Sequence, residues 1–194
     1  FFTFCRLLLE KYKNQSHVMT ISGTNYQRER KTIHSYYFSR YMHCWGWATW
    51  RDAWRRFDHE MSTWPTVRDQ RWLSQIFASK SSVSYWHDIF DRVHSNEIDS
   101  WAYVWQYSIW MRGGLNVIPE VNLVENVGFG DEATHTKSSK GVDTKTDSMD
   151  DPIRHPDVLI RHRDADYYTQ HNHYQTSFTN RIVNKLRKWN PLDA

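Results

Sequence analysis

The sequence is most informative between residues 41 and 51, which read Tyr41-Met42-His43-Cys44-Trp45-Gly46-Trp47-Ala48-Thr49-Trp50-Arg51. Ordinary protein cores take their volume from leucine, isoleucine and valine, whereas tryptophan is favoured where a large flat surface must also offer a polar N–H group. The glycine between Trp45 and Trp47 lets the backbone turn sharply between two indole rings. Two interpretations follow: a tightly packed aromatic corner of the core, or an aromatic surface that binds a ligand.

The composition of the chain limits its class. It has 194 residues, enough for one domain with a buried core, and eleven of them are tryptophan. A mean hydropathy of −0.80 and the lack of a long apolar run argue against a transmembrane span. The net charge of +3, with no basic stripe among the aromatic residues, argues against nucleic-acid binding. Cys5 and Cys44 could form one disulfide, but a reduced pair in a cytoplasmic protein is the simpler interpretation.

A helix and two strands are predicted before the tryptophan-rich stretch, as in an open α/β sheet. The strands are expected over residues 17–23, which end at a glycine turn, and over 34–39. Because the sequence has no initial Met and enters a helix directly, we expect it to be a fragment of a longer reading frame. The apolar face of that first helix comprises Phe1, Phe4, Cys5, Leu8 and Tyr12.

Further helices are predicted after the stretch. One is expected over 49–57, with Trp50 and Trp54 in the core, and short ones are expected within 70–94. Another should begin at Asp99 or Ser100, either of which suits the N-cap, and end at a pair of glycines. Strands are then expected over 115–118 and 122–125.

The C-terminal part of the chain is polar. Residues 137–151 contain almost no apolar side chain, which predicts a mobile loop. We therefore divide the chain into residues 1–136, this loop, and a tail over 152–194. A helix predicted over 177–189 has an apolar stripe and a basic side, so it either caps the domain or contacts a membrane surface. The spacing of four histidines here matches no compact zinc site: His155, His162, His171 and His173.

Several segments, in this order, resemble the C-terminal portion of bacterial nucleotide-diphospho-sugar transferases, which are glycosyltransferases of the GT-A fold in the broad family 2 group. The resemblance spans about residues 1–136, and its tryptophan and glycine-rich blocks are specific in combination. The segments are Phe1–Cys5 leading to Ile21–Gly23, then Tyr37–Arg40, Trp45–Arg51, Ile98–Trp101 and Asn126–Thr136.

The resemblance implies an α/β fold, the C-terminal part of a GT-A type open mixed sheet with flanking helices. It also implies a hexosyltransferase-like enzyme of polysaccharide biosynthesis that moves a sugar from a nucleotide-sugar donor to an acceptor hydroxyl, with inversion. In this family an acidic motif holds a divalent metal, Mn²⁺ or Mg²⁺, on the donor diphosphate. That motif would precede Phe1, and the pair Asp150-Asp151 is not accepted as its substitute. The chain should therefore hold the acceptor side and the catalytic base.

The resemblance also assigns roles to residues. It makes Asp99 the catalytic base, with Glu97 as a nearby alternative, although by sequence alone Asp99 is more simply an N-cap. It assigns His135 to the metal or the diphosphate, because an imidazole can ligate a cation when neutral and pair with phosphate when charged. Gly128 and Gly130 would let the backbone approach the donor closely.

The acceptor is expected on aromatic rings, because the C–H groups of sugars pack on them while sugar hydroxyls seek polar partners. A different class of function remains open: a non-catalytic carbohydrate-binding or interaction module that keeps the aromatic surface without transferring sugar. The candidate acceptor residues are Trp45, Gly46, Trp47 and Trp101.

Overall fold

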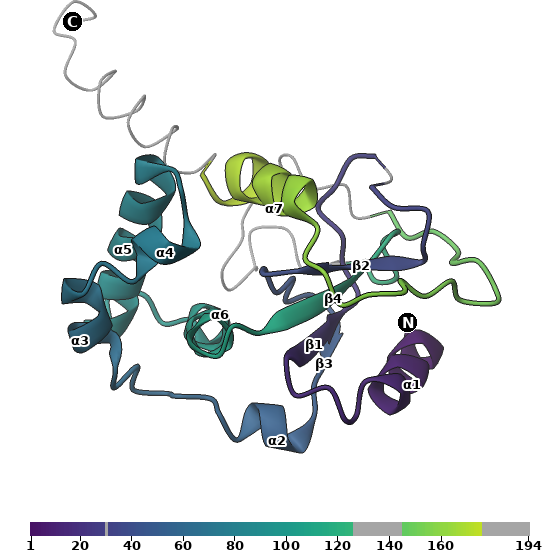
Figure 1. The fold of residues 1–194 in the computed structure, drawn as a ribbon, viewed down its shortest axis with the longest axis horizontal. Helices are drawn as coiled ribbons and strands as arrows, with labels where there is room; N and C mark the ends of the chain where they lie inside the picture. The colour runs from purple at the N-terminus through teal and green to yellow at the C-terminus, as the bar shows by residue number, and fades with distance from the viewer. Residues whose placement is uncertain (30, 126–144, 176–194) are drawn as a thin grey trace, which may run out of the picture.

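The computed structural model describes residues 1–29, 31–125 and 145–175 (Figure 1). It is a mixed α/β structure in which strands form one sheet in the order β2-β4-β1-β3. β1 runs parallel to β4, whereas β2 and β3 run antiparallel to their neighbours at the two sides. The expected mixed sheet with flanking helices is confirmed at this level. The strands are β1 Val18–Ser22, β2 Tyr36–Ser39, β3 Trp47–Ala48 and β4 Leu115–Pro119.

Helices flank this sheet and form a separate layer beside it (Figure 1). The first helix and the helix that begins after Ser100 lie where the sequence predicts them, and Ser100 is the N-cap of the latter. No described helix has the length and apolar character needed to cross a membrane. The helices are α1 Phe2–Lys11, α2 Arg51–Trp54, α3 Trp64–Asp69, α4 Leu73–Ile76, α5 Lys80–His94, α6 Trp101–Met111, α7 Arg163–Thr169 and the π-helix η1 Gln170–Tyr174.

Two predicted elements differ in the structure. The helix expected over 49–57 is reduced to α2, and Trp54, expected in the core, is 39% exposed. The strand expected over 122–125 is irregular. The polar groups of this segment bond to the loop that follows β1. The backbone N–H of Leu123 donates to the carbonyl of Gly23 at 2.8 Å, and the Asn122 side chain accepts from the backbone N–H of Asn25 at 2.7 Å.

One face of the sheet is covered by α1, whose expected apolar side chains are buried there, except that Phe1 is only partly buried. Tyr12 on the helix and Tyr36 on β2 share a hydrogen bond between their hydroxyls at 2.5 Å. The register of β1 against β4 shifts between Val18 and Thr20. Because of this irregularity Val18 and Ile21, three positions apart, both face α1.

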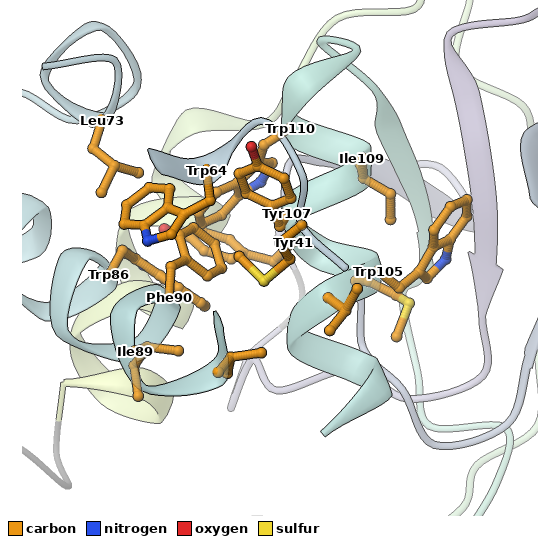
Figure 2. Packing of buried hydrophobic residues seen from close by; sticks show 14 of the residues in the cluster. Tyr41, Trp64, Leu73, Trp86, Ile89, Phe90, Trp105, Tyr107, Ile109 and Trp110 are labelled. Carbon is orange, nitrogen blue, oxygen red and sulfur yellow. The ribbon is translucent and has the colours of Figure 1, made fainter. Parts of the chain in front are cut away.

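A second and larger cluster of rings packs between α5 and α6 (Figure 2). Trp86 and Trp110 meet edge to face with ring centres 4.7 Å apart, and Phe90 contacts Tyr107 in the same manner at 5.4 Å. Trp105 lies on another side of α6, away from the labelled rings of this group (Figure 2). Several of the tryptophans therefore pack in the core.

The described chain after Pro152, which the sequence suggested as a tail, packs along β2. Arg154 and Ser35 join through the backbone at 2.9 Å, and Arg161 forms a parallel bridge with Phe38. The buried carboxylate of Asp166 on α7 then accepts from the Ser39 hydroxyl at 2.6 Å. These contacts make residues 154–175 part of the same folded unit as the sheet.

Candidate functional site

The candidate site lies at the carboxyl ends of the parallel strands β1 and β4, the edge where open α/β sheets usually bind ligands. Residues 23–26 follow β1 and residues 120–124 follow β4. The two loops are joined by hydrogen bonds, including one from the Asn25 amide to the carbonyl of Glu120 at 2.8 Å. The loop 41–46, which leads into β3, lies against both of them.

The Trp45-Gly46 corner is fixed by this arrangement. Gly46 has a φ of +58°, and a Cβ there would lie 2.7 Å from a methyl carbon of Val124. The Thr24 hydroxyl donates to the carbonyl of Trp45 at 2.7 Å, and the Gly23 N–H donates to that of Gly46 at 2.5 Å. Glycine is therefore required both by the backbone conformation and by the close approach of the loop after β4.

A stack of three rings stands behind the corner. Tyr26 lies flat between His43, at 3.9 Å between ring centres, and His173 of η1, at 3.7 Å. The ring of Trp45 meets Tyr26 edge to face at 6.0 Å. The stack thus links three segments that are far apart in the sequence, and π-helical turns such as η1 are frequent at functional sites.

Both histidines of the stack are neutral. Burial lowers the pKa of His43 to about 3 and that of His173 to about 4. Nδ1 of His43 lies 2.8 Å from the carbonyl of Thr24, so this nitrogen carries the proton and donates it. Its Nε2 is buried and has no hydrogen-bond partner among the described residues.

The groups near the stack that could ionise are also held neutral. Burial, together with the nearby Cys44 and Tyr103, raises the pKa of Tyr26 well above its usual value. Burial likewise raises the pKa of the Cys44 thiol and, away from the stack on α1, brings the pKa of Cys5 to about 11. Both cysteines are free, as expected. They are thiols at neutral pH, which makes them poor nucleophiles.

Trp101, the first residue of α6, contacts Trp47, the residue that follows the corner. The rings of Trp47 and Trp101 stack with centres 5.2 Å apart and planes at 24°. Asp99, two positions earlier, is exposed and makes no hydrogen bond or ion pair with another described residue. Because Ser100 is the N-cap, the interpretation of Asp99 as a plain N-cap is wrong. Its carboxylate has no structural partner in this part of the chain.

The remaining predicted site residues divide into two groups. Glu97 is engaged on the surface by Arg92, with Nε and Oε2 3.4 Å apart. The donor-side residues Gly128, Gly130 and His135 lie outside the described residues, as does the helix predicted over 177–189. Among the residues that the structure describes, no three His, Cys, Asp or Glu side chains gather as a metal site requires. Asp150, of the rejected acidic pair, bonds to Arg154 at 2.6 Å.

Sequence reasoning missed the ring stack. Tyr26 lies in a polar stretch that we expected to be only a loop, and His173 entered only as one of four histidines weighed for zinc. The available signal is weak: Tyr26 is the one aromatic residue between Gly23 and Ile33, and it lies three positions after the end of a predicted strand. A lone aromatic residue in a polar loop at a strand end favours a buried or ligand-facing role.

Comparison of the chain with models of known protein families, with curated proteins and with solved structures finds no match in any of the three.

Proposed function

We propose that the chain is the acceptor-binding part of an inverting glycosyltransferase of GT-A type, which uses a nucleotide-sugar donor. The observation that carries the proposal is the exposed Asp99, which has no hydrogen-bond or ion-pair partner among the described residues and lies two positions before Trp101, whose ring stacks on Trp47. A carboxylate next to a flat aromatic surface suits a sugar hydroxyl, because the rings hold the C–H face of the sugar while the carboxylate accepts the hydroxyl proton.

The position of these residues supports the proposal. The stretches on which the resemblance rests, residues 21–23, 45–51 and 98–101, meet at one end of the sheet through Gly46, Trp47 and Trp101. This is the carboxyl end of the parallel strands, where ligands of open α/β sheets bind. Segments separated by more than seventy positions in the sequence thus adjoin a single site.

In the proposed reaction Asp99 acts as general base. The acceptor hydroxyl passes its proton to a carboxylate oxygen of Asp99 while its own oxygen forms a bond to the anomeric carbon of the donor sugar. The bond from that carbon to the diphosphate oxygen breaks, the diphosphate leaves with the electron pair, and the configuration inverts. A divalent ion, Mn²⁺ or Mg²⁺, would neutralise the leaving diphosphate when bound.

The test compares Asp99→Asn with Glu97→Gln in the natural polypeptide that carries these residues. Transfer is followed as release of nucleoside diphosphate from a panel of UDP-, GDP- and dTDP-sugars with added acceptor glycans. We expect Asp99→Asn to lower turnover by about 100- to 10,000-fold, the usual contribution of a general base, with nucleotide affinity nearly unchanged. Glu97→Gln should leave turnover close to that of the unaltered protein.

Two outcomes would overturn parts of this proposal. Substantial turnover in Asp99→Asn would remove Asp99 from the base role, and loss of turnover in Glu97→Gln alone would transfer that role to Glu97. If no nucleotide sugar is turned over but glycans bind, the aromatic surface belongs to a carbohydrate-binding module, the other function that the exposed rings support.

A further inference from the structure

A hollow of about 460 Å³ lies between α2 and the segment that joins α1 to β1. Residues 12–16 lead into β1, and residues 50–56 follow β3, which runs antiparallel to β1. Both segments therefore lie at the amino end of β1, whereas the candidate site lies at the carboxyl end (Figure 1). We call this hollow the basic pocket, after four of its lining side chains: Lys13, Arg51, Arg55 and Arg56.

Both walls of the basic pocket are fastened to the folded core. On one wall the Tyr12 hydroxyl shares a hydrogen bond with that of Tyr36 on β2 at 2.5 Å, and the Gln15 N–H donates to the carbonyl of Tyr12 at 2.9 Å. On the other wall the indole N–H of Trp50 donates to the carbonyl of Leu9 at 2.9 Å. The cationic side chains are thus carried by backbone that is held in place without a ligand, which lowers the entropic cost of binding one.

The basic pocket concentrates positive charge. Its lining contains four cationic side chains, and Asp52 is the one acidic residue among the described residues that line it. The excess of cationic over acidic side chains in this single pocket is as large as that of the whole chain, whose net charge is +3. An anion close to these side chains is therefore attracted by several charges at once.

Two of the arginines have no counter-ion in the described part of the chain. Arg55 pairs with Asp52 at 3.2 Å, and Lys13 pairs with a glutamate of α1 at 2.5 Å, but the side chains of both pairs are more than half exposed. Such exposed pairs contribute little free energy. Arg51 and Arg56 make no side-chain hydrogen bond or ion pair with a described residue. An anion can therefore bind here without breaking a buried interaction.

We propose that the basic pocket binds a compound that carries a phosphate or diphosphate group. The planar guanidinium groups of Arg51 and Arg56 suit this ligand, because two N–H donors of one guanidinium match two oxygens of one phosphate, whereas Lys13 supplies a point charge. The volume of the pocket is typical of sites for small organic ligands, so it has room for the phosphate and for part of the molecule that carries it.

The phosphate has two possible sources, a soluble compound or the head group of a lipid. The second source is included because Lys13 and Trp50 also line a groove of mainly apolar side chains beside α1. The proposal does not rest on the proposed transferase, since it involves neither Asp99 nor the ring pair of Trp47 and Trp101. Either proposal can therefore fail without the other.

The test is isothermal titration of the natural polypeptide with pyrophosphate, in about 0.1 M sodium chloride to screen loose surface attraction. A parallel measurement follows co-sedimentation with vesicles of phosphatidylglycerol and, as a neutral reference, of phosphatidylcholine. Saturation by pyrophosphate with a Kd of about 1 mM or below would assign the pocket to soluble phosphorylated compounds. Binding to phosphatidylglycerol vesicles alone would assign it to a lipid head group.

Two double variants with the same change in charge locate the binding. Arg51→Gln with Arg56→Gln should weaken it about tenfold or more, the size of one or two lost charge-assisted hydrogen bonds. Arg71→Gln with Arg112→Gln, at two exposed arginines outside the pocket, should change it by less than about twofold. Arg51→Lys with Arg56→Lys keeps the charge and should recover only part of the affinity.

Near-ultraviolet circular dichroism establishes that each variant is folded. The absence of binding in both measurements would overturn the proposal. Equal weakening by the two glutamine pairs would also overturn it, because binding would then depend on the net charge of the protein and not on the pocket. Full affinity in the lysine pair would overturn the recognition of phosphate by the paired donors of the guanidinium groups.

Discussion

Gly46 and Gly113 have nearly the same backbone conformation, with φ of +58° and +61°, but different surroundings. A Cβ at position 46 would lie 2.7 Å from Val124, whereas at position 113 nothing lies within 4 Å. We expect Gly113→Ala to lower the free energy of unfolding by about 1 kcal/mol, the usual penalty of the left-handed conformation. Gly46→Ala should lose a further ~1–3 kcal/mol through overlap with a stiff β-branched side chain. Equal losses in urea unfolding would show that Val124 moves aside freely.

The two neutral histidines of the stack make stability depend on pH. Their pKa values in the folded protein, about 3 for His43 and about 4 for His173, lie below the ordinary 6.5. The unfolded chain therefore binds more protons as pH falls below 6.5, so their stabilising contribution is complete above that pH and is lost toward pH 4. Each histidine lowers the free energy of unfolding by at most about 1.4 kcal/mol per pH unit.

We expect His173→Phe, which keeps a flat ring on Tyr26, to reduce this acid slope by about half. The measurement is urea unfolding at a series of pH values from about 7 to about 5. A slope equal to that of the unaltered protein would contradict the prediction that His173 is neutral in the fold.

Asp166 changes the free energy of unfolding with pH in the opposite direction to the two histidines. Burial raises its pKa to about 6, although Ser39 and Arg40 both favour the ionised form. The folded protein thus holds a proton there that the unfolded chain releases above about pH 4, so this contribution is present at low pH and is lost as pH rises through 6. We expect Asp166→Asn to steepen the loss of stability in acid, because the offsetting gain disappears. Equal slopes in Asp166→Asn and in the unaltered protein would contradict the prediction.

Among the elements, η1 is attached to the core by ring contacts of His173 and Tyr174 and by the hydrogen bonds of the Gln170 side chain. The Gln170 carbonyl oxygen accepts from the Tyr41 hydroxyl at 2.6 Å and from the Trp86 indole at 2.8 Å. Gln170→Ala leaves two buried donors without an acceptor and should lower the free energy of unfolding by about 2–4 kcal/mol. Hydrogen exchange of the backbone after β2 should also accelerate. Asn172→Ala, whose side chain bonds on the exposed surface, should lose less than about 0.5 kcal/mol; similar losses in both variants would show that Gln170 does not attach η1.

Elements with local signals could be predicted, and elements set by distant contacts could not. The apolar period between Ser100 and Gly113 defines α6, since both ends carry their capping residues. The strand expected over 122–125 fails because its polar groups bond to Asn25, 97 positions earlier in the chain. The helix after Trp50 stops early, and Phe57 folds back to stack on Trp54 instead of continuing the helical face. Neither contact leaves a trace in the local sequence.

In the whole molecule the two hydrophobic clusters meet at β1, which contributes Val18 and Ile21 to one and Met19 to the other. We therefore expect cooperative unfolding, with tryptophan fluorescence and far-ultraviolet circular dichroism changing together. Leu8→Ala, at a fully buried position on α1, should lower the free energy of unfolding by about 2–5 kcal/mol and keep the two signals coincident. Leu7→Ala, at an exposed position, should have little effect. A fluorescence change that lags behind the helical signal would show that the ring cluster unfolds separately.

The candidate site could be predicted only in part. The sequence pointed to Trp47 and Trp101, whose rings stack in the structure, and to Asp99, which is exposed two positions before Trp101. It could not reveal that Tyr26 lies between His43 and His173, because stacking depends on how the chain after Pro152 returns to the sheet. Nor could it separate buried tryptophans from exposed ones, since Trp54 and Trp105 both fall at the helical spacing of apolar residues in the sequence but only Trp105 is buried.

The stacked indoles of Trp47 and Trp101 also give the protein a built-in optical reporter. Two identical chromophores 5.2 Å apart, with planes at 24°, couple their electronic transitions. Such a pair produces a two-signed band in the circular dichroism spectrum, and any molecule that separates or reorients the rings changes it. Occupation of this surface can therefore be followed in unlabelled protein, before the identity of any ligand is known.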